Sequence, residues 1–429
     1  MTIKSTFIWT SIHTAIKILS GIIMNKVVAV YLGPAGLAII GQFQNFSQLI
    51  INIATGSIHS GIVKYTAENK NDKDLLNKVW SNALFINLFL TVFVTSIIVI
   101  LNEYLSNKIL FSFEYSTLIF IFGVALIFNV LNMYIISIFN GLQDIKLFTM
   151  VNIIISLITL VIVTFMTYKY SLIGALYALV ITQSVVFIIS FFLMYKNYKA
   201  DFFNSDLFEK IDFSVIKKLL SYGAVSFVSG GMMSLMLLMV RHIIQSDMSI
   251  EYAGYWEALW KISTYFTMLT MLPASIYYLP KYAELNNCGD IKIKFLESLK
   301  FFLPIQLFFG IILFIFKVYI IKLLFTNEFL LISDVMLFMI IGDIIRVVAY
   351  LIVNIMYAKA FVLKLIILDI VYNTMLVILI YFLFKEYTLL GLGYSYLIAN
   401  IFVFLYVLRF YLKLDYFIKL GEKKCLKIN

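Results

Sequence analysis

The sequence is poor in charge, proline and cysteine. Only 13% of its 429 residues are charged while 62% are hydrophobic, and it has four prolines. A soluble protein of this size could not cover its surface with so few charges. The two cysteines, Cys288 and Cys425, fall in segments predicted to be cytoplasmic, and the three histidines are scattered, so we expect neither a disulfide nor a metal site. Phosphate loops and dinucleotide motifs are also absent, so we expect no cofactor and no enzymatic activity.

Long hydrophobic stretches dominate the sequence instead. About 20 consecutive apolar residues suffice for a helix to cross the hydrocarbon core of a bilayer. The sequence contains twelve such stretches and therefore predicts an all-α polytopic membrane protein. They run over 7–31, 37–62, 79–101, 115–140, 147–168, 172–195, 216–241, 251–280, 298–321, 330–356, 361–384 and 389–412.

The basic residues predict the orientation of these spans. Lys and Arg exceed Asp and Glu, for a net charge of +10, and cytoplasmic loops of membrane proteins are enriched in basic residues. With the N-terminus inside, 23 of the 33 Lys and Arg fall in cytoplasmic segments and six, including Arg241, fall outside. We therefore expect both termini in the cytoplasm, and we attribute the positive charge to orientation rather than to nucleic-acid binding.

An internal repeat divides the sequence. Lys64-Tyr65 and Ala67-Glu68 recur as Lys281-Tyr282 and Ala283-Glu284, about 217 residues later. Six spans per half insert both halves in the same direction, which predicts two six-helix bundles related as parallel repeats. The predicted bundles are 1–200 and 216–429, the latter ending in a basic tail, with a cytoplasmic linker at 201–215.

Amides line the predicted spans of the first half at helical spacing. An amide facing lipid is costly, so such a face should point toward protein or water. The fourth span carries Asn129 and Asn132. The second span carries Asn45, Gln48, Asn52, Thr55 and His59, spaced three and four apart on one helical face.

Ionisable residues occupy the spans of the second half. Glu257 and Lys261 are four residues apart, and Asp343 and Arg346 share a face; each couple could be a structural pair or part of a site. Asp369 has no cation one turn away in its own helix. In the first half, Lys17 lies deep in the first span without a partner in its own helix, which favours a functional role.

Several short motifs together resemble one transporter family. In this order they are similar to Wzx-type flippases of the multidrug/oligosaccharidyl-lipid/polysaccharide exporter superfamily, especially the O-antigen and enterobacterial common antigen translocases. The similarity runs nearly end to end. The motifs are Gly33-Pro34-Ala35-Gly36-Leu37, Lys64-Tyr65, Gly254-Tyr255-Trp256, Tyr278-Leu279-Pro280, Gly342-Asp343 through Ala349-Tyr350, and Ala358-Lys359-Ala360.

This resemblance implies a multi-pass protein of the bacterial inner membrane with a central cavity between two bundles. It implies movement of an undecaprenyl-diphosphate-linked oligosaccharide, such as an O-antigen repeat unit, to the periplasmic leaflet by alternating access. Membrane lipids would be partners, as would a polysaccharide polymerase and a chain-length regulator. Because the sequence has no ATP-binding motif, we expect turnover to be driven by an ion gradient or by consumption of the substrate on the far side.

Each polar group then has an expected role. We expect cationic side chains to bind the diphosphate, amides to form hydrogen bonds with sugar hydroxyls, and intramembrane acids to bind the coupling ion. The competing interpretation is a sodium- or proton-coupled drug or metabolite exporter of the same fold. The short outside loops disfavour a third, a polysaccharide polymerase. The candidates are Lys17, Lys261 and Arg346 for the diphosphate; Asn45, Gln48, Asn52, Asn129 and Asn132 for sugar; and Asp369, Glu257 and Asp343 for coupling.

Overall fold

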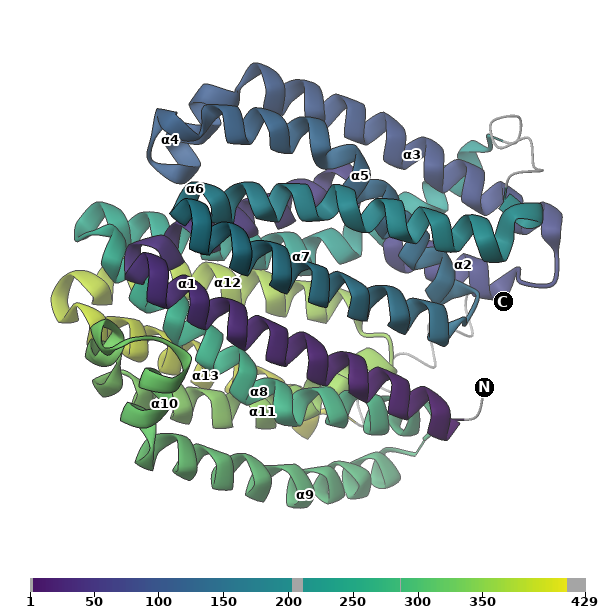
Figure 1. The fold of residues 1–429 in the computed structure, drawn as a ribbon. Helices are drawn as coiled ribbons and strands as arrows, with labels where there is room; N and C mark the ends of the chain where they lie inside the picture. Colours follow the sequence, from purple (N-terminus) through teal and green to yellow (C-terminus); the bar gives the residue numbers. More distant parts are fainter. Residues whose placement is uncertain (1–2, 203–210, 286, 415–429) are drawn as a thin grey trace. The chain divides into compact units, whose positions relative to one another are not determined.

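The computed structural model describes residues 3–202, 211–285 and 287–414. Within these residues the chain is helical and contains no strand (Figure 1). It forms two compact units, Met1–Leu238 and Met239–Asn429. The helices are α1 (Ile3–Ala54), α2 (His59–Glu68), α3 (Lys73–Ile100), α4 (Asn102–Leu110), α5 (Ser116–Gly141), α6 (Ile145–Phe202), α7 (Phe213–Asp247), α8 (Ile250–Glu284), α9 (Cys288–Ile315), α10 (Lys317–Leu324), α11 (Met336–Ala358), α12 (Val362–Tyr387) and α13 (Leu389–Leu412), with 3-10 turns at Phe113–Tyr115 and Asn327–Asp334.

Nine helices in the described part of the chain are long and apolar enough to cross a membrane. Two of them, α1 and α6, are about twice the length of one span, and each contains a kink: at Gly33 in α1, and at Tyr170 and Ser171 in α6. Helix α8 has 35 residues but carries intramembrane charges, which lower its hydropathy. Division at the two kinks and inclusion of α8 yields twelve segments of spanning length, the number predicted from the sequence.

The predicted second span is wrong as one continuous helix. Helix α1 ends at Ala54, and α2 begins at His59. The Thr55 hydroxyl donates to the Ile51 carbonyl at 2.8 Å, and Gly56 and Ser57 adopt positive φ values of 55° and 52°. Because the turn breaks the helical periodicity, His59 does not continue the face that begins at Asn45.

In the first unit, α6 packs along α1 and α5, and α5 packs on α3, as Figure 1 shows for the last pair. The start of α7 is tied to α3: Lys78 and Asp212 are 2.5 Å apart, and the Asp212 amide donates to Asn82 Oδ1 at 2.8 Å. The hydrogen bond from Lys78 holds the pKa of the Asp212 carboxyl below its usual range. Most of α7 groups with the first unit. The predicted linker at 201–215 lies mostly outside the described residues and stays a prediction.

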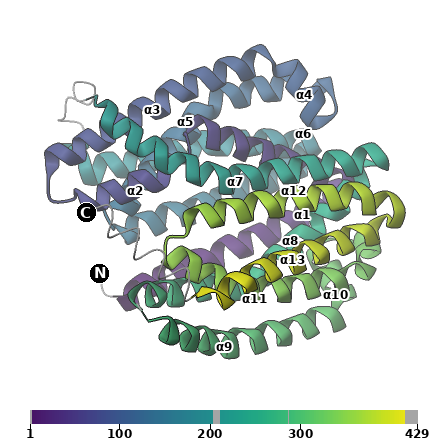
Figure 2. The ribbon, with the colours of Figure 1, turned by 180° about the vertical axis from the view of Figure 1, so that it is seen from behind.

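In the second unit, α11 is central and packs against α8, α9 and α13, while α12 packs on α13 (Figure 2). Its core repeats that of the first unit. Each residue of one set has its counterpart 217 positions later in the other, which is the offset of the sequence repeat. The sets are Tyr134, Ile135, Ile138, Phe139 and Val151 in the first unit, and Leu351, Ile352, Ile355, Met356 and Leu368 in the second.

The backbone repeats at the same offset. Gln143 and Ala360 have positive φ values of 58° and 53°, and Ser171 and Thr388 have 52° and 50°. These residues follow α5 and α11, and interrupt or end the next long helix in each unit. Positive φ is uncommon for residues other than glycine. Its recurrence at matching positions supports an internal duplication with the same chain direction in both units.

Candidate functional site

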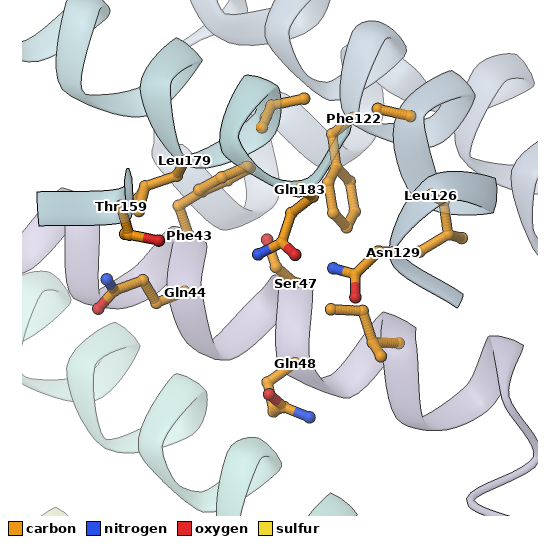
Figure 3. Close-up of a pocket in the computed structure, with 13 residues that line it drawn as sticks. Phe43, Gln44, Ser47, Gln48, Phe122, Leu126, Asn129, Thr159, Leu179 and Gln183 are labelled. Atoms are coloured by element: carbon orange, nitrogen blue, oxygen red, sulfur yellow. The ribbon is translucent and has the colours of Figure 1, made fainter. Parts of the chain in front are cut away.

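A cavity of about 250 Å³ lies inside the first unit, between α1, α5 and α6 (Figure 3). Phe43, Phe122, Leu126 and Leu179 supply apolar walls. In Figure 3 the amide of Gln183 reaches toward Ser47 and Asn129. The cavity therefore combines an apolar wall with a neutral polar lining. The polar residues are Gln44, Ser47, Gln48, Asn129, Thr159 and Gln183.

Of the five amides predicted to bind sugar, two line this cavity: Gln48 and Asn129. The other three have local partners. Asn45 donates to the Gly41 carbonyl at 2.8 Å, and Asn52 accepts from Gln48 Nε2 at 3.0 Å. Asn132 is buried and accepts from the Ser190 hydroxyl at 2.6 Å, which joins α5 to α6. These three amides make contacts within the helix bundle instead of lining the cavity.

The second unit contains a buried cluster of three charges. Arg241 of α7 is 1% exposed and donates from Nε and Nη2 to Glu257 Oε2 at 2.9 and 2.5 Å. Lys261, one turn along α8, lies 3.3 Å from the other oxygen of Glu257. The predicted Glu257–Lys261 pair is therefore present, but Glu257 also serves a second cation. The sequence analysis placed Arg241 in an outside segment; in the structure it lies within α7, which continues to Asp247, and it is buried against Glu257.

A second buried cluster centres on Tyr396 of α13. Its hydroxyl donates to Asp343 at 2.5 Å and accepts from Arg346 Nη1 at 3.1 Å. Ser263 of α8 also donates to Asp343, at 2.6 Å. The guanidinium carbon of Arg346 lies 5.8 Å from the centre of the Trp260 ring, within the range of a cation–π contact. The couple Asp343 and Arg346, predicted from one helix face, is thus bridged by a tyrosine of another helix.

Arg346 also lines a cavity of about 230 Å³ inside the second unit. Asp369 of α12 lines the same cavity, together with tyrosines from α11 and α12. Cation and carboxylate therefore share one chamber, unlike the neutral cavity of the first unit. The polar lining residues are Arg346, Tyr350, Tyr357, Asp369, Tyr372 and Asn400.

The two cavities occupy equivalent places in the repeat. Asn129 and Gln183 of the first correspond, 217 residues later, to Arg346 and Asn400 of the second. The sequence showed the first correspondence but did not single out Gln183, because it is the only amide in its span and forms no stripe. A comparison of residues 217 positions apart pairs Gln183 with Asn400, and this pairing could have identified Gln183 from the sequence.

The two units differ in the ratio of acidic to basic residues within their helices. In the second unit, Glu257 pairs with Arg241 and Lys261, Tyr396 bridges Asp343 to Arg346, and Asp369 lines the same cavity as Arg346. The six predicted spans of the first half contain no Asp or Glu, but the first span carries Lys17 and Lys26. In the structure the Lys17 side chain is exposed on α1. Lys17 is thus an intramembrane cation of α1 with no acid in the spans of its own half.

In the described part of the chain, no group of three His, Cys, Asp or Glu side chains could hold a metal ion.

Comparison with known proteins places these features in a family. The family model described as "Polysaccharide biosynthesis protein" matches residues 3–285. Lipid III flippases from Escherichia coli (strain K12) and from Shigella flexneri are each 23% identical over 407 residues, which cover 94% of this chain and 97% of the relative. The similarity to both relatives therefore extends over both units.

Solved structures share the fold. An inward-facing multidrug resistance MATE family transporter of the MOP superfamily has a TM-score of 0.78 at 18% identity, with 97% of this chain and 99% of that chain covered. A MOP superfamily transporter from Pyrococcus furiosus has a TM-score of 0.70 at 18% identity, with 95% of each chain covered. This likeness confirms the predicted all-helical polytopic membrane fold.

Proposed function

Because the chain belongs to the polysaccharide biosynthesis protein family, we propose that it is a flippase for a lipid-linked oligosaccharide. The membership is consistent with the resemblance predicted from the sequence motifs. The observation that carries the proposal is the similarity to lipid III flippases over 94% of the chain. The proposed substrate is an undecaprenyl-diphosphate-linked glycan, moved from the cytoplasmic to the periplasmic leaflet of the bacterial inner membrane. Both termini are proposed to be cytoplasmic.

The physical problem for such a protein is the head group. An isoprenoid tail can stay in the bilayer, whereas a diphosphate and sugars are strongly disfavoured in hydrocarbon. A cation without a matching acid can compensate the diphosphate charge. Lys17 suits this role because the spans of its half contain no carboxylate. Arg346 is the second candidate, since it lines a cavity. Lys261 is a weaker one, because Glu257 already neutralises it.

Ion coupling, if it drives transport, needs an acid that can exchange its ion. Asp343 accepts two hydrogen bonds while buried, and Glu257 lies between two cations. Asp369 lines the cavity of the second unit and is the candidate we favour. A polysaccharide polymerase and a chain-length regulator remain proposed partners downstream of the flipped glycan.

The alternative is an ion-coupled drug or metabolite exporter. It rests on the fold shared with multidrug transporters, at 18% identity. Its expected signature was intramembrane acids without matching bases. In the second unit Glu257 pairs with two cations, Tyr396 bridges Asp343 to Arg346, and Asp369 lines the same cavity as Arg346, while the spans of the first half contain no acid. The charge distribution therefore favours an anionic substrate.

The test is genetic. Deletion of the gene should abolish the surface polysaccharide ladder on a lipopolysaccharide gel, and restoration should recover it. Lys17→Ala should fail to restore the ladder at normal protein level, whereas Lys17→Arg, which keeps the charge, should restore at least part of it. An unchanged ladder in the deletion strain together with new drug sensitivity would instead support the exporter. Full activity of both Lys17→Ala and Arg346→Ala would exclude a role for these cations in transport.

A further inference from the structure

The neutral cavity of the first unit contains polar groups that the protein itself does not satisfy. Within the described residues, the side chains of Gln44, Asn129, Thr159 and Gln183 form no hydrogen bond, although Asn129 is only 6% exposed. The Ser47 hydroxyl is buried and also has no partner. Most buried polar groups in proteins are paired, because an unpaired one costs about 1–3 kcal/mol. Asn129 and the Ser47 hydroxyl are buried, while Gln44, Thr159 and Gln183 are half-buried. Five polar side chains around one chamber without a partner in the described residues therefore indicate a site whose partners come from outside the protein.

The lining defines the chemistry of the occupant. No ionisable side chain borders this cavity, so a charged group would have no counter-ion there. Each amide presents an acceptor and two donors, and each hydroxyl can act as either. A ligand that satisfies them must itself offer both donors and acceptors. The rings of Phe43 and Phe122 at the wall require that part of its surface be apolar.

An uncharged sugar ring meets these requirements, because hydroxyl or acetamido groups surround a ring that also exposes C–H groups. The volume of about 250 Å³ is at the small end of ligand pockets, which begin near roughly 300 Å³. The chamber therefore has room for about one ring and not for an oligosaccharide. The lipid tail and the diphosphate would remain outside it.

We infer that this cavity binds a single uncharged glycosyl residue of the transported head group, with Asn129 and Gln183 as its main specificity-determining residues. The inference rests on the proposed flippase function for its biological role, but the binding site can be tested by itself. It also assigns different selectivity to the two repeat-related cavities. The cavity with Arg346 and Asp369 suits a charged substituent, whereas this one excludes it.

The first experiment measures sugar binding to the purified full-length protein in detergent. Glucose, galactose, N-acetylglucosamine and N-acetylgalactosamine are each added, with sorbitol at equal molarity as the control for general stabilisation by polyols. At least one sugar should raise the Tm above the sorbitol value, and glucuronic acid should not. Gln183→Leu and Asn129→Leu should each abolish the difference or weaken apparent binding roughly tenfold.

Two controls keep this result interpretable. Neither amide bonds to the protein, so Gln183→Leu should leave the Tm without sugar unchanged or higher, which separates lost binding from misfolding. Asn152→Leu is the matched control: Asn152 lies on the same helix, outside the cavity, and donates to the Phe148 carbonyl. It should retain the sugar effect. If none of the four sugars exceeds sorbitol, or if Gln183→Leu and Asn129→Leu both respond like the wild type, the inference is wrong.

The second experiment separates this inference from the proposed function. In the deletion strain, Lys17→Ala, Gln183→Leu and Asn129→Leu are compared at equal protein level. Loss of the polysaccharide ladder in all three supports both proposals. Loss only in Lys17→Ala supports the flippase and overturns the sugar pocket. If the deletion itself leaves the ladder unchanged, the flippase proposal fails, and the Tm experiment alone decides whether the cavity binds sugar.

Discussion

At the residue scale, Glu257 connects helices α7 and α8 and pairs with two cations. It accepts from Arg241 of α7 at 2.5 Å and lies 3.3 Å from Lys261 of its own helix. Burial of a charge is tolerated only when that charge is paired, and removal of one partner exposes the full desolvation cost of the other. The geometry therefore favours a structural role for Glu257 over ion coupling.

We predict that Glu257→Gln destabilises the protein more than Arg241→Met does. The first change leaves two buried cations without a counter-charge and should cost about 3–5 kcal/mol, whereas after the second Glu257 keeps Lys261. Thermal unfolding of the detergent-purified variants measures the order. A Glu257→Gln variant that unfolds like the wild type but transports without ion dependence would instead identify Glu257 as a coupling residue.

At the element scale, the kinks in the long helices depend on backbone conformation. Gly33 adopts φ 62° and ψ −165°, a region almost restricted to glycine. Ser171 occupies a similar conformation at φ 52° and ψ −139°, and Thr388 at φ 50° and ψ −128°. A residue with a Cβ is strained in this region, so the backbone conformations of Ser171 and Thr388 lower the stability of the folded protein.

We predict opposite effects of substitution at these kinks. Gly33→Ala should destabilise the protein by about 1–3 kcal/mol. Ser171→Gly should stabilise it by about 1 kcal/mol, because relief of strain exceeds the entropic cost of glycine. Thr388→Gly should behave like Ser171→Gly, since the two positions are equivalent in the repeat. Shifts in Tm measure all three, and a lower Tm for both glycine variants would contradict the strain argument.

At the scale of the whole molecule, the distribution of charge along the chain makes a prediction about orientation. Basic residues concentrate in alternate loops, and such loops stay in the cytoplasm. Because the sequence has only two cysteines, a cysteine-free background needs only Cys288→Ser and Cys425→Ser. Single cysteines can then report the side of each loop.

We predict that Lys108→Cys, in the last turn of α4, reacts with a membrane-impermeant maleimide in cells with a permeabilised outer membrane. Asn71→Cys, between α2 and α3, should react only after lysis. Both side chains are exposed, so a difference in labelling reports location and not burial. The reverse pattern would place both termini outside and would invert the proposed direction of transport.

The sequence alone predicted much of this architecture. Hydrophobic length predicted the spans, and the recurrence of Lys64-Tyr65 at Lys281-Tyr282 predicted the offset of 217 residues that the cores and backbone turns also follow. The spans and the repeat can be predicted from the sequence because they depend only on local composition and on the order of residues along the chain. The break after Ala54 was missed, because a short polar turn inside a long apolar stretch leaves the hydropathy almost unchanged.

Only the tertiary structure decided which polar groups are paired. Arg241 reaches Glu257 from another helix, and Tyr396 joins Asp343 to Arg346, although α13 is remote in sequence from α11. Gln183, a lone amide in its span, turned out to border the neutral cavity. A hydrogen bond between helices depends on the rotation and packing of both, so helical spacing within one span can show that a face is polar but cannot show whether a partner or a cavity lies opposite.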